Sequence, residues 1–275
     1  MDATRHRLVQ RRGWDRASTS YARYWQRQLL PAQELLLSAA GLHAGDVVID
    51  VACGSGEMTM AVARAVAPGG RVLATDLSPK MVQATAALAA DVGMVDVTTR
   101  CCDAEALDVH ERFDVALCSL GLMYVSDPSL AVRELDRVVR PGGRVAVSVW
   151  GDRARCGWAG VFEIVAARVV SDVCPRFFAL GTMGTLTGLL SRAGFVDVDE
   201  TRLCVDLVYR DDAEAIGAAF LGGPVALAYA HFDTTTRDDV AREYLTTLRA
   251  FRDADGGYRV PGEFVVASAR RPTTA

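Results

Sequence analysis

The chain has 275 residues, 51% of them hydrophobic, which suffices for one large domain or two small ones. Its formal net charge of −4 and its lack of any basic block argue against a nucleic-acid partner. No apolar run reaches the roughly 18 residues of a membrane helix, and the charged first residues lack the apolar segment of a secretory signal, so we expect a cytoplasmic protein without a membrane span.

Residues 1–45 are predicted to be helical. Their early part is basic, and Tyr21 and Trp25 begin an apolar series at helical spacing. Pro31 is a point where this helix is expected to break or restart, and Gly41 is expected to cap its end.

The stretch 47–57 begins as a short apolar run that contains Asp50 and continues with Ala52, Gly54 and Gly56. The apolar run predicts a buried strand. The small residues allow a sharp backbone turn and let a ligand approach the main chain. Helical spacing follows directly. Strand, tight turn and helix form the ligand-binding corner of a doubly wound α/β fold.

A second apolar strand, 71–75, leads into Asp76, about 20 residues after the turn, where an acid can accept both hydroxyls of a ribose. An exposed acid at a strand end is the alternative interpretation. Glu57 at the first helical turn would repel a pyrophosphate. The pattern therefore disfavours an NAD-dependent oxidoreductase, which stays a rival hypothesis, and leaves room for a ligand with a cationic centre.

From residue 46 to residue 150 strands and helices are predicted to alternate. The predicted strands are 47–51, 71–75, 95–101, 113–118 and 143–149. The predicted helices are 57–67, 79–92 and 129–140, and the predicted helix-to-strand turns are 68–70 and 141–143. Ser78 is expected to cap a helix that has Pro79 at its first position.

After residue 150 the pattern is less regular. Helices are predicted at 158–170, 185–193, 212–221 and 239–252, a long sixth strand at 195–209, a final strand at 263–269 and an irregular aromatic segment at 175–178. The segments 151–182 and 211–258 are rich in aromatic residues. A lid of that composition suits a small, partly apolar substrate.

Five segments in chain order resemble motifs of the class I S-adenosylmethionine-dependent methyltransferases. They are D-V-A-C-G-S-G at 50–56, D-L-S-P-K-M-V at 76–82, C-D-A-E at 102–105, F-D through L-G-L-M-Y at 113–124, and L-D-R-V-V-R-P-G-G at 135–143. The closest group includes menaquinone and ubiquinone C-methyltransferases and many O- and N-methyltransferases of small molecules. Ala52 and Cys102 depart from it, because each stands where the family usually has glycine.

The resemblance implies an α/β fold with a doubly wound, seven-stranded, mostly parallel sheet whose last strand is antiparallel between strands five and six. It implies a single domain with an N-terminal helical lid at 1–45, a cofactor-binding core at 46–150, and substrate-lid insertions plus the last two strands at 151–275.

The resemblance also implies S-adenosyl-L-methionine as the cofactor. Asp76 would hold its ribose, Asp103 would accept from the adenine amino group, and Tyr21 would contact the amino-acid end unless it is a packing residue. The remaining implied contacts are Asp50, Ala52, Cys53 and Gly54 at the methionine end, Leu77, Met81 and Ala104 around the adenine, and Ser119 at the mouth of methyl transfer.

The catalytic groups are less clearly marked. Many relatives carry histidines after the fourth strand, where this chain has L-M-Y-V at 122–125. Tyr124 could position a substrate, although an unperturbed tyrosine is a poor base at neutral pH. His231 could approach from the lid, with a surface or packing role as the alternative. Proximity alone suffices for a good nucleophile.

The expected activity is methyl transfer to an O, N or C atom of a small, partly apolar metabolite. A cyclase or another group transferase could keep the same motifs. The seven cysteines include no C-x-x-C pair, so we expect reduced thiols and no metal site. Methylation of a thiol or metalloid at Cys156 and Cys174 is a less favoured alternative. A homodimer is one expected oligomeric state.

Overall fold

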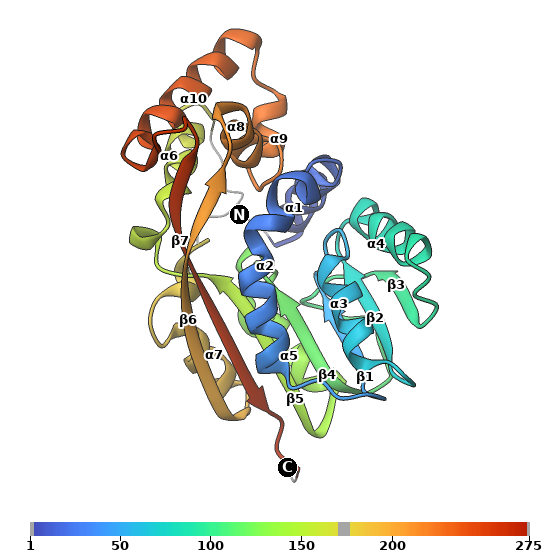
Figure 1. Cartoon of the computed structure of the whole chain (residues 1–275). Helices are drawn as coiled ribbons and strands as arrows, with labels where there is room; N and C mark the ends of the chain where they lie inside the picture. Colours follow the sequence, from blue (N-terminus) through green and yellow to red (C-terminus); the bar gives the residue numbers. More distant parts are fainter. Residues whose placement is uncertain (1–2, 170–176, 274–275) are drawn as a thin grey trace.

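A seven-stranded sheet forms the centre of the protein (Figure 1). The structure is a computed structural model that describes residues 3–169 and 177–273. The strand order is β3-β2-β1-β4-β5-β7-β6. Strands β1 to β5 are parallel, and β7 is antiparallel to both β5 and β6. This confirms the predicted doubly wound fold with an antiparallel last strand between the fifth and sixth.

The strands are β1 (Val47–Val51), β2 (Arg71–Asp76), β3 (Val97–Cys101), β4 (Phe113–Ser119), β5 (Val139–Trp150), β6 (Val196–Tyr209) and β7 (Tyr258–Arg270). The α-helices are α1 (Ala3–Ala17), α2 (Tyr21–Ala40), α3 (Glu57–Val66), α4 (Pro79–Asp91), α5 (Pro128–Val138), α6 (Val161–Ala166), α7 (Thr185–Arg192), α8 (Asp212–Phe220), α9 (Ala226–Ala230) and α10 (Thr234–Thr247). Short 3-10 helices are η1 (Leu122–Tyr124), η2 (Arg153–Arg155), η3 (Gly157–Gly160), η4 (Ala179–Gly181) and η5 (Arg249–Phe251).

Helices cover both faces of the sheet. Successive side chains of a strand point to opposite faces, so each strand contributes apolar residues to the packing on both sides. Val48 of β1 packs in one apolar cluster with Met58 of α3 and Leu36 of α2. Its neighbour Ile49 packs in the other cluster, which includes Leu135 of α5. Burial on both faces explains why the central strands are almost wholly apolar.

Helix α2 runs unbroken through Pro31, so the predicted break there is wrong. Its buried positions Trp25, Leu29 and Leu36 lie on one side, and their packing holds the helix together across the proline. Gly41 ends the helix in the left-handed conformation, with φ 56°, as predicted.

Other boundaries also differ from the predictions. Strand β5 already begins at Val139, so 141–143 lies inside it rather than in a turn; Gly143 accepts a hydrogen bond there from Arg271, just beyond β7. Asp233 caps α10 by accepting from Thr236 N at 2.8 Å, which starts that helix earlier than expected. The helix expected at 158–170 is η3 followed by α6, and its expected end lies outside the described residues.

Helices α6, α8, α9 and α10 gather beyond one end of the sheet, where α1 also lies (Figure 1). Helix α1 contacts both α4 and α9. The parallel strands β1 to β5 end on this side, and ligands of open α/β sheets bind at the carboxyl ends of the strands. None of the helices in the described part of the chain is long and apolar enough to cross a membrane.

Candidate active site

The turn after β1 closely approaches helix α4 and the loop after β4. Gly56 has φ 97°, and a Cβ added there would lie 3.0 Å from Thr85 of α4. A Cβ on Gly121, after β4, would lie 2.5 Å from the Cβ of Ala52. Ala52 itself is left-handed, with φ 61°, a conformation that L-residues with a side chain rarely adopt. Backbone strain of this kind is concentrated at functional sites.

Asp76 lies at the end of β2 and fixes the turn. Its Oδ2 accepts from Gly54 N at 3.0 Å, and its Oδ1 accepts from Ser78 N at 2.8 Å. The side chain is 9% exposed. Burial raises the pKa of Asp76 to about 6, and the two backbone donors oppose that rise. The Asp76 carboxylate is therefore buried beside the turn and held there by two backbone N–H groups.

Asp50 and Cys53 lie behind the turn. Thr59 Oγ1 donates to Asp50 Oδ2 at 2.6 Å, while Asp50 Oδ1 has no partner among the described residues. Burial raises the pKa of Asp50 to about 7. Cys53 Sγ lies 3.5 Å from Thr85 Oγ1, and burial raises the pKa of this thiol as well. Neither side chain lines the cavity described next.

A cavity of about 730 Å³, counting open solvent at its mouth, lies above the turn. Ten residues singled out from the sequence line it, namely Tyr21, Ala52, Gly54, Asp76, Leu77, Met81, Asp103, Ala104, Ser119 and Tyr124. We refer to this space as the polar cavity. The chain thus brings together the ends of β1, β2 and β4, the loop after β3 and the start of α2.

Helix α1 covers the polar cavity with residues that the sequence did not single out. His6, Arg7, Gln10 and Trp14 line it. His6 Nε2 lies 2.8 Å from the carbonyl oxygen of Tyr124, and Arg7 Nε lies 3.4 Å from Asp103 Oδ2. These contacts hold α1 against the loops that follow β3 and β4.

The end of α1 is also tied to α4. Ser78 Oγ donates to Asp15 Oδ1 at 2.6 Å, and the same hydroxyl accepts from Met81 N at 3.1 Å as the predicted cap of α4. No motif in the charged segment 1–16 predicts these contacts, because they form only when α1 packs against α4 and the loops after β3 and β4.

Glu105 orders the loop beyond η1. It is 8% exposed and accepts from Ser126 Oγ at 2.9 Å and from Asp127 N at 2.7 Å. Its own N–H donates to Asp103 Oδ1 at 2.9 Å. The acids of the C-D-A-E segment therefore support the wall of the polar cavity as well as lining it.

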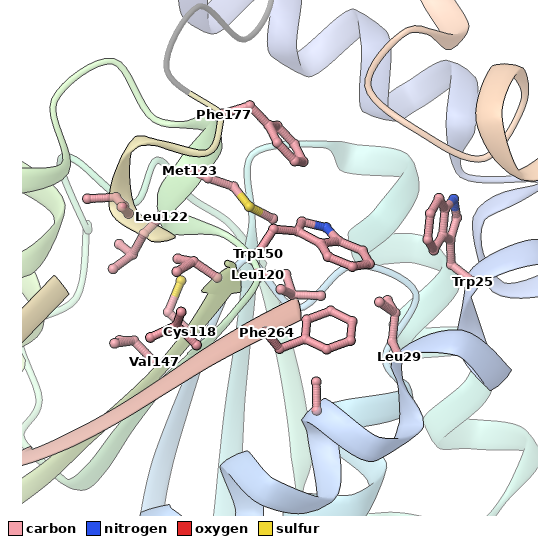
Figure 2. Packing of buried hydrophobic residues seen from close by; sticks show 14 of the residues in the cluster. Trp25, Leu29, Cys118, Leu120, Leu122, Met123, Val147, Trp150, Phe177 and Phe264 are labelled. Carbon is pink, nitrogen blue, oxygen red and sulfur yellow. The ribbon is translucent and has the colours of Figure 1, made fainter. Parts of the chain in front are cut away.

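A second, smaller space of about 290 Å³ adjoins the first, and we call it the aromatic chamber. Trp14, Tyr21, Leu120 and Tyr124 line both spaces. The residues that line only the aromatic chamber are Trp25, Leu29, Met123, Trp150, Trp158, Gly222, Gly223 and Pro224. Figure 2 shows several of these side chains close together, with Phe264 beside Trp150.

Aromatic rings form the shared wall. The Trp14 ring lies edge-on to Tyr124, with centroids 4.8 Å apart, and edge-on to Tyr21, at 5.6 Å. Burial and the nearby carboxylates of Glu57 and Asp76 raise the pKa of Tyr21, so its phenol stays protonated at neutral pH. The wall is therefore mostly apolar, and the hydroxyl of Tyr21 in it is neutral.

His231 lies outside both spaces. It follows α9, is exposed, and lines neither the polar cavity nor the aromatic chamber. The expectation that it approaches the site from the lid has no support here, because an exposed residue outside both walls has no contact with a ligand held in them. Of the two candidate catalytic residues, Tyr124 lies at the site and His231 does not.

Comparisons with known proteins place the chain in a family. A family model described as a methyltransferase domain matches residues 49–147. Nocamycin O-methyltransferase of Saccharothrix syringae is 31% identical over 239 residues, which cover 80% of this chain and 84% of that protein. This chain belongs to the S-adenosylmethionine-dependent methyltransferases.

Other relatives agree with this assignment. An uncharacterised protein of Mycobacterium tuberculosis is 32% identical over 220 residues, covering 77% of this chain and 76% of that protein. The ubiquinone/menaquinone biosynthesis C-methyltransferase of Hahella chejuensis is 34% identical over 135 residues, covering 48% of this chain and 51% of that protein. The resemblance found in the sequence motifs is thereby confirmed.

Solved structures share the fold of this methyltransferase. A candidate methyltransferase from Bacillus halodurans gives a TM-score of 0.62 at 21% identity, covering 88% of this chain and 100% of that one. Phosphoethanolamine N-methyltransferase 2 of Haemonchus contortus, in complex with S-adenosyl-L-methionine, gives 0.61 at 17% identity, covering 94% and 57%. The [4+2]-cyclase SpnF gives 0.56 at 22% identity, covering 90% and 82%. S-Adenosyl-L-methionine is the cofactor of this chain.

Proposed function

We propose that this enzyme methylates an O, N or C atom of a small, partly apolar metabolite held in the aromatic chamber. The observation that carries the proposal is the shared wall. The polar cavity, which Asp76 and Asp103 line, adjoins a space that no charged side chain lines among the described residues, and Trp14, Tyr21, Leu120 and Tyr124 belong to both. A charged ligand and an uncharged one can therefore be held next to each other.

The residues of the polar cavity fit the cofactor. Each oxygen of Asp76 accepts one backbone hydrogen bond, and an ionised carboxylate has about four acceptor sites. Lone pairs thus remain for two ribose hydroxyls. Leu77 and Met81 offer apolar contact to the adenine, Asp103 an acceptor for its amino group, and Ala104 a backbone contact. Gly54 leaves the main chain open to the methionine end.

Buried acids make this end of the sheet suited to a cation. Asp50 is fully buried and Asp76 nearly so, and burial raises the pKa of both. A positive charge nearby lowers these pKa values and favours the carboxylates. When bound, S-adenosyl-L-methionine supplies a methyl carbon activated by a sulfonium. Asp50 and Cys53 would act from behind the turn, by holding its shape.

The side chains at the wall would position the acceptor and exclude water rather than remove a proton. Tyr21 has a raised pKa and His231 lies away from the site, and no Asp, Glu or His lines the aromatic chamber in the described part of the chain. Tyr124 and Ser119 would orient the reacting atom. The acceptor is then a group that is nucleophilic by itself, brought into line with the methyl carbon.

The three parts of the chain would divide the work. Residues 46–150 would bind the cofactor, residues 1–45 would cover it, and the insertions within 151–275 would shape the acceptor site, while the last two strands complete the sheet. Helix α1 supports this division, since it covers the polar cavity through His6, Arg7 and Trp14.

Calorimetry with S-adenosyl-L-methionine, S-adenosylhomocysteine and NAD tests the cofactor. We expect binding of the first two and no heat with NAD. Incubation with methyl-labelled cofactor and a metabolite extract then tests the reaction, and the label should appear in a small, chromatographically apolar product. A product formed without incorporation of the label would instead favour a cyclase or other group transferase. Absence of any thermal shift with either sulfur compound would refute the assignment of the polar cavity.

A further inference from the structure

The aromatic chamber has an uncharged wall. Trp14, Tyr21, Trp25, Tyr124, Trp150 and Trp158 supply its rings, and no charged side chain lines it among the described residues. Ionic groups buried without a partner are strongly disfavoured. The body of a molecule held there is therefore uncharged.

The wall also favours a flat shape. A Cβ added to Gly222 would lie 3.0 Å from Cδ1 of Trp25, so the loop between α8 and α9 presents bare backbone to that ring. Trp150 and Trp158 belong to the same wall, with centroids 4.8 Å apart. The space of about 290 Å³ counts open solvent at its mouth. A flat molecule bound there would lie against aromatic faces.

One polar group in this wall lacks a partner. Trp158 is 3% exposed, and its Nε1 donates no hydrogen bond within the described residues. The comparison with Trp25 is direct, because Trp25 lines the same space but donates from Nε1 to Ala218 O at 3.2 Å. Buried indole N–H groups usually have a partner. The unpaired donor of Trp158 indicates that a ligand supplies the acceptor.

We propose that Trp158 determines acceptor specificity by donating its indole N–H to a carbonyl oxygen of a flat, uncharged, conjugated hydroxy-carbonyl compound in the aromatic chamber. This inference rests on the proposed function and narrows its substrate class. The hydroxyl that receives the methyl group lies toward the shared wall, and the carbonyl lies toward Trp158. A conjugated carbonyl also makes such a hydroxyl more acidic. Its proton would pass to water at the mouth of the polar cavity as its oxygen bonds the methyl carbon and the methyl–sulfur bond breaks, which needs no basic side chain in this wall.

Two probes that differ chiefly in the carbonyl test this in the full-length protein with S-adenosylhomocysteine bound. They are 7-hydroxycoumarin and 2-naphthol, both flat two-ring phenols. We expect the wild-type enzyme to bind 7-hydroxycoumarin about tenfold more tightly than 2-naphthol, because a buried donor left unpaired is costly. This first comparison uses no variant.

Trp158→Phe keeps an aromatic ring and removes the donor. We expect it to weaken 7-hydroxycoumarin binding about tenfold and to leave 2-naphthol within about twofold. The matched variant Trp25→Phe removes an indole N–H that already has a partner, so it should change the two affinities by the same factor. Methyl transfer from labelled cofactor to 7-hydroxycoumarin should fall in parallel with its binding to Trp158→Phe.

Three results would overturn the inference. They are equal affinity of the wild-type enzyme for the two probes, equal weakening of both by Trp158→Phe, and no binding of either probe. Calorimetry of S-adenosyl-L-methionine on the same samples separates this failure from failure of the proposed function. Normal cofactor binding with any of the three results rejects only the role of Trp158, whereas loss of cofactor binding in the wild-type enzyme rejects the proposed function itself.

Discussion

The polar cavity and the aromatic chamber are built in different ways. The polar cavity depends on short-range contacts at strand ends, such as Asp76 with Ser78 N and Asp103 with Glu105 N, each two residues away. The aromatic chamber is lined by rings from α1, α2, η1, β5 and η3 and by the loop after α8, which are spread from Trp14 to Pro224. One is a set of backbone turns, and the other is a product of tertiary packing.

This difference has a consequence for substitutions. A carboxylate that accepts defined hydrogen bonds cannot be replaced by its neighbours, so its loss should act on one ligand and strongly. A ring in a packed cluster shares its contacts with several others, so its loss should be smaller and should act through the shape of the space.

Asp76→Ala should have the largest effect. It removes the acceptor that is proposed for the ribose and also the acceptor for Gly54 N. Hydrogen bonds to a charged group are worth about 1.5–3 kcal/mol, so we expect S-adenosyl-L-methionine to bind roughly 10- to 100-fold more weakly by calorimetry. Asp108→Ala is the matched control, since Asp108 is exposed. An unchanged dissociation constant in a folded Asp76→Ala protein would remove Asp76 from the site.

Much of the first region was predictable from the sequence, for a physical reason. A left-handed turn needs small residues, a strand end needs an apolar run before it, and a helix start needs a cap, so Gly54, Asp76 and Ser78 each leave a local signature. Ten residues of the polar cavity wall could be named in advance, through the resemblance of such motifs to a family, whereas His6, Arg7, Gln10 and Trp14 of α1 could not. The last-strand topology, by contrast, came from family resemblance.

The second region was not predictable in the same way. Composition indicated an aromatic lid, yet nothing near Trp158 or Trp25 in the sequence shows that their rings lie 5.7 Å apart. His6 and Trp14 lie in a charged segment whose role depends on docking. Pro31 misled because local propensity predicts a break, while packing of Leu29 and Leu36 keeps α2 continuous. Such facts depend on tertiary contacts.

Cofactor affinity should depend on pH. In the free protein burial raises the pKa of Asp76 to about 6 and that of Asp50 to about 7. A bound cation favours the ionised forms, so binding must expel these protons at low pH. We expect the association constant to be constant above about pH 8 and to fall below that, approaching a tenfold loss per unit for each group protonated. Asp76→Asn should make the association constant less dependent on pH below pH 6. An unaltered slope there would contradict the role of Asp76 in cofactor binding.

The pH dependence of Asp50 and Asp76 has the opposite direction for the free energy of unfolding. Because their pKa values are higher in the folded protein than the usual 3.8, the folded state binds more protons than the unfolded chain. Their contribution favours folding below about pH 4 and is lost as the pH rises to about 7. Asp50→Asn should therefore make the urea midpoint less dependent on pH in this range. An unchanged pH dependence would show that Asp50 is already ionised in the free protein.

A substitution in the aromatic region should have a smaller and different effect. Phe177 packs on Tyr124, at 5.4 Å, and on Trp158, at 5.7 Å. Phe177→Leu should weaken binding of 7-hydroxycoumarin about three- to tenfold, since aromatic pairs add roughly 0.5–1.5 kcal/mol. Cofactor affinity should stay the same. Parallel loss of cofactor binding would show that the two regions are not independent.

Phe232→Leu provides the control for this comparison. Neither residue lines the two spaces, but Phe177 contacts the wall rings Tyr124 and Trp158, whereas the similarly buried Phe232 packs on Tyr229, at 6.1 Å, which lies in neither wall. Its truncation should lower the melting temperature while leaving both affinities unchanged. If Phe232→Leu weakened the acceptor probe as much as Phe177→Leu does, the lid would act through its general stability.

The smallest effect should come from the contact that joins α1 to the polar cavity. Arg7 Nε lies 3.4 Å from Asp103 Oδ2, with the two side chains 37% and 21% exposed. Ion pairs of that exposure contribute about 0.2–1 kcal/mol, so Arg7→Gln should speed dissociation of S-adenosyl-L-methionine by at most about fivefold. The change should vanish near 1 M salt, where the screening length is only about 3 Å. Arg12→Gln, on an exposed part of the same helix, should leave the rate unchanged. If both variants speeded release equally, or if the effect persisted at high salt, α1 would cover the cofactor through packing by Trp14 alone.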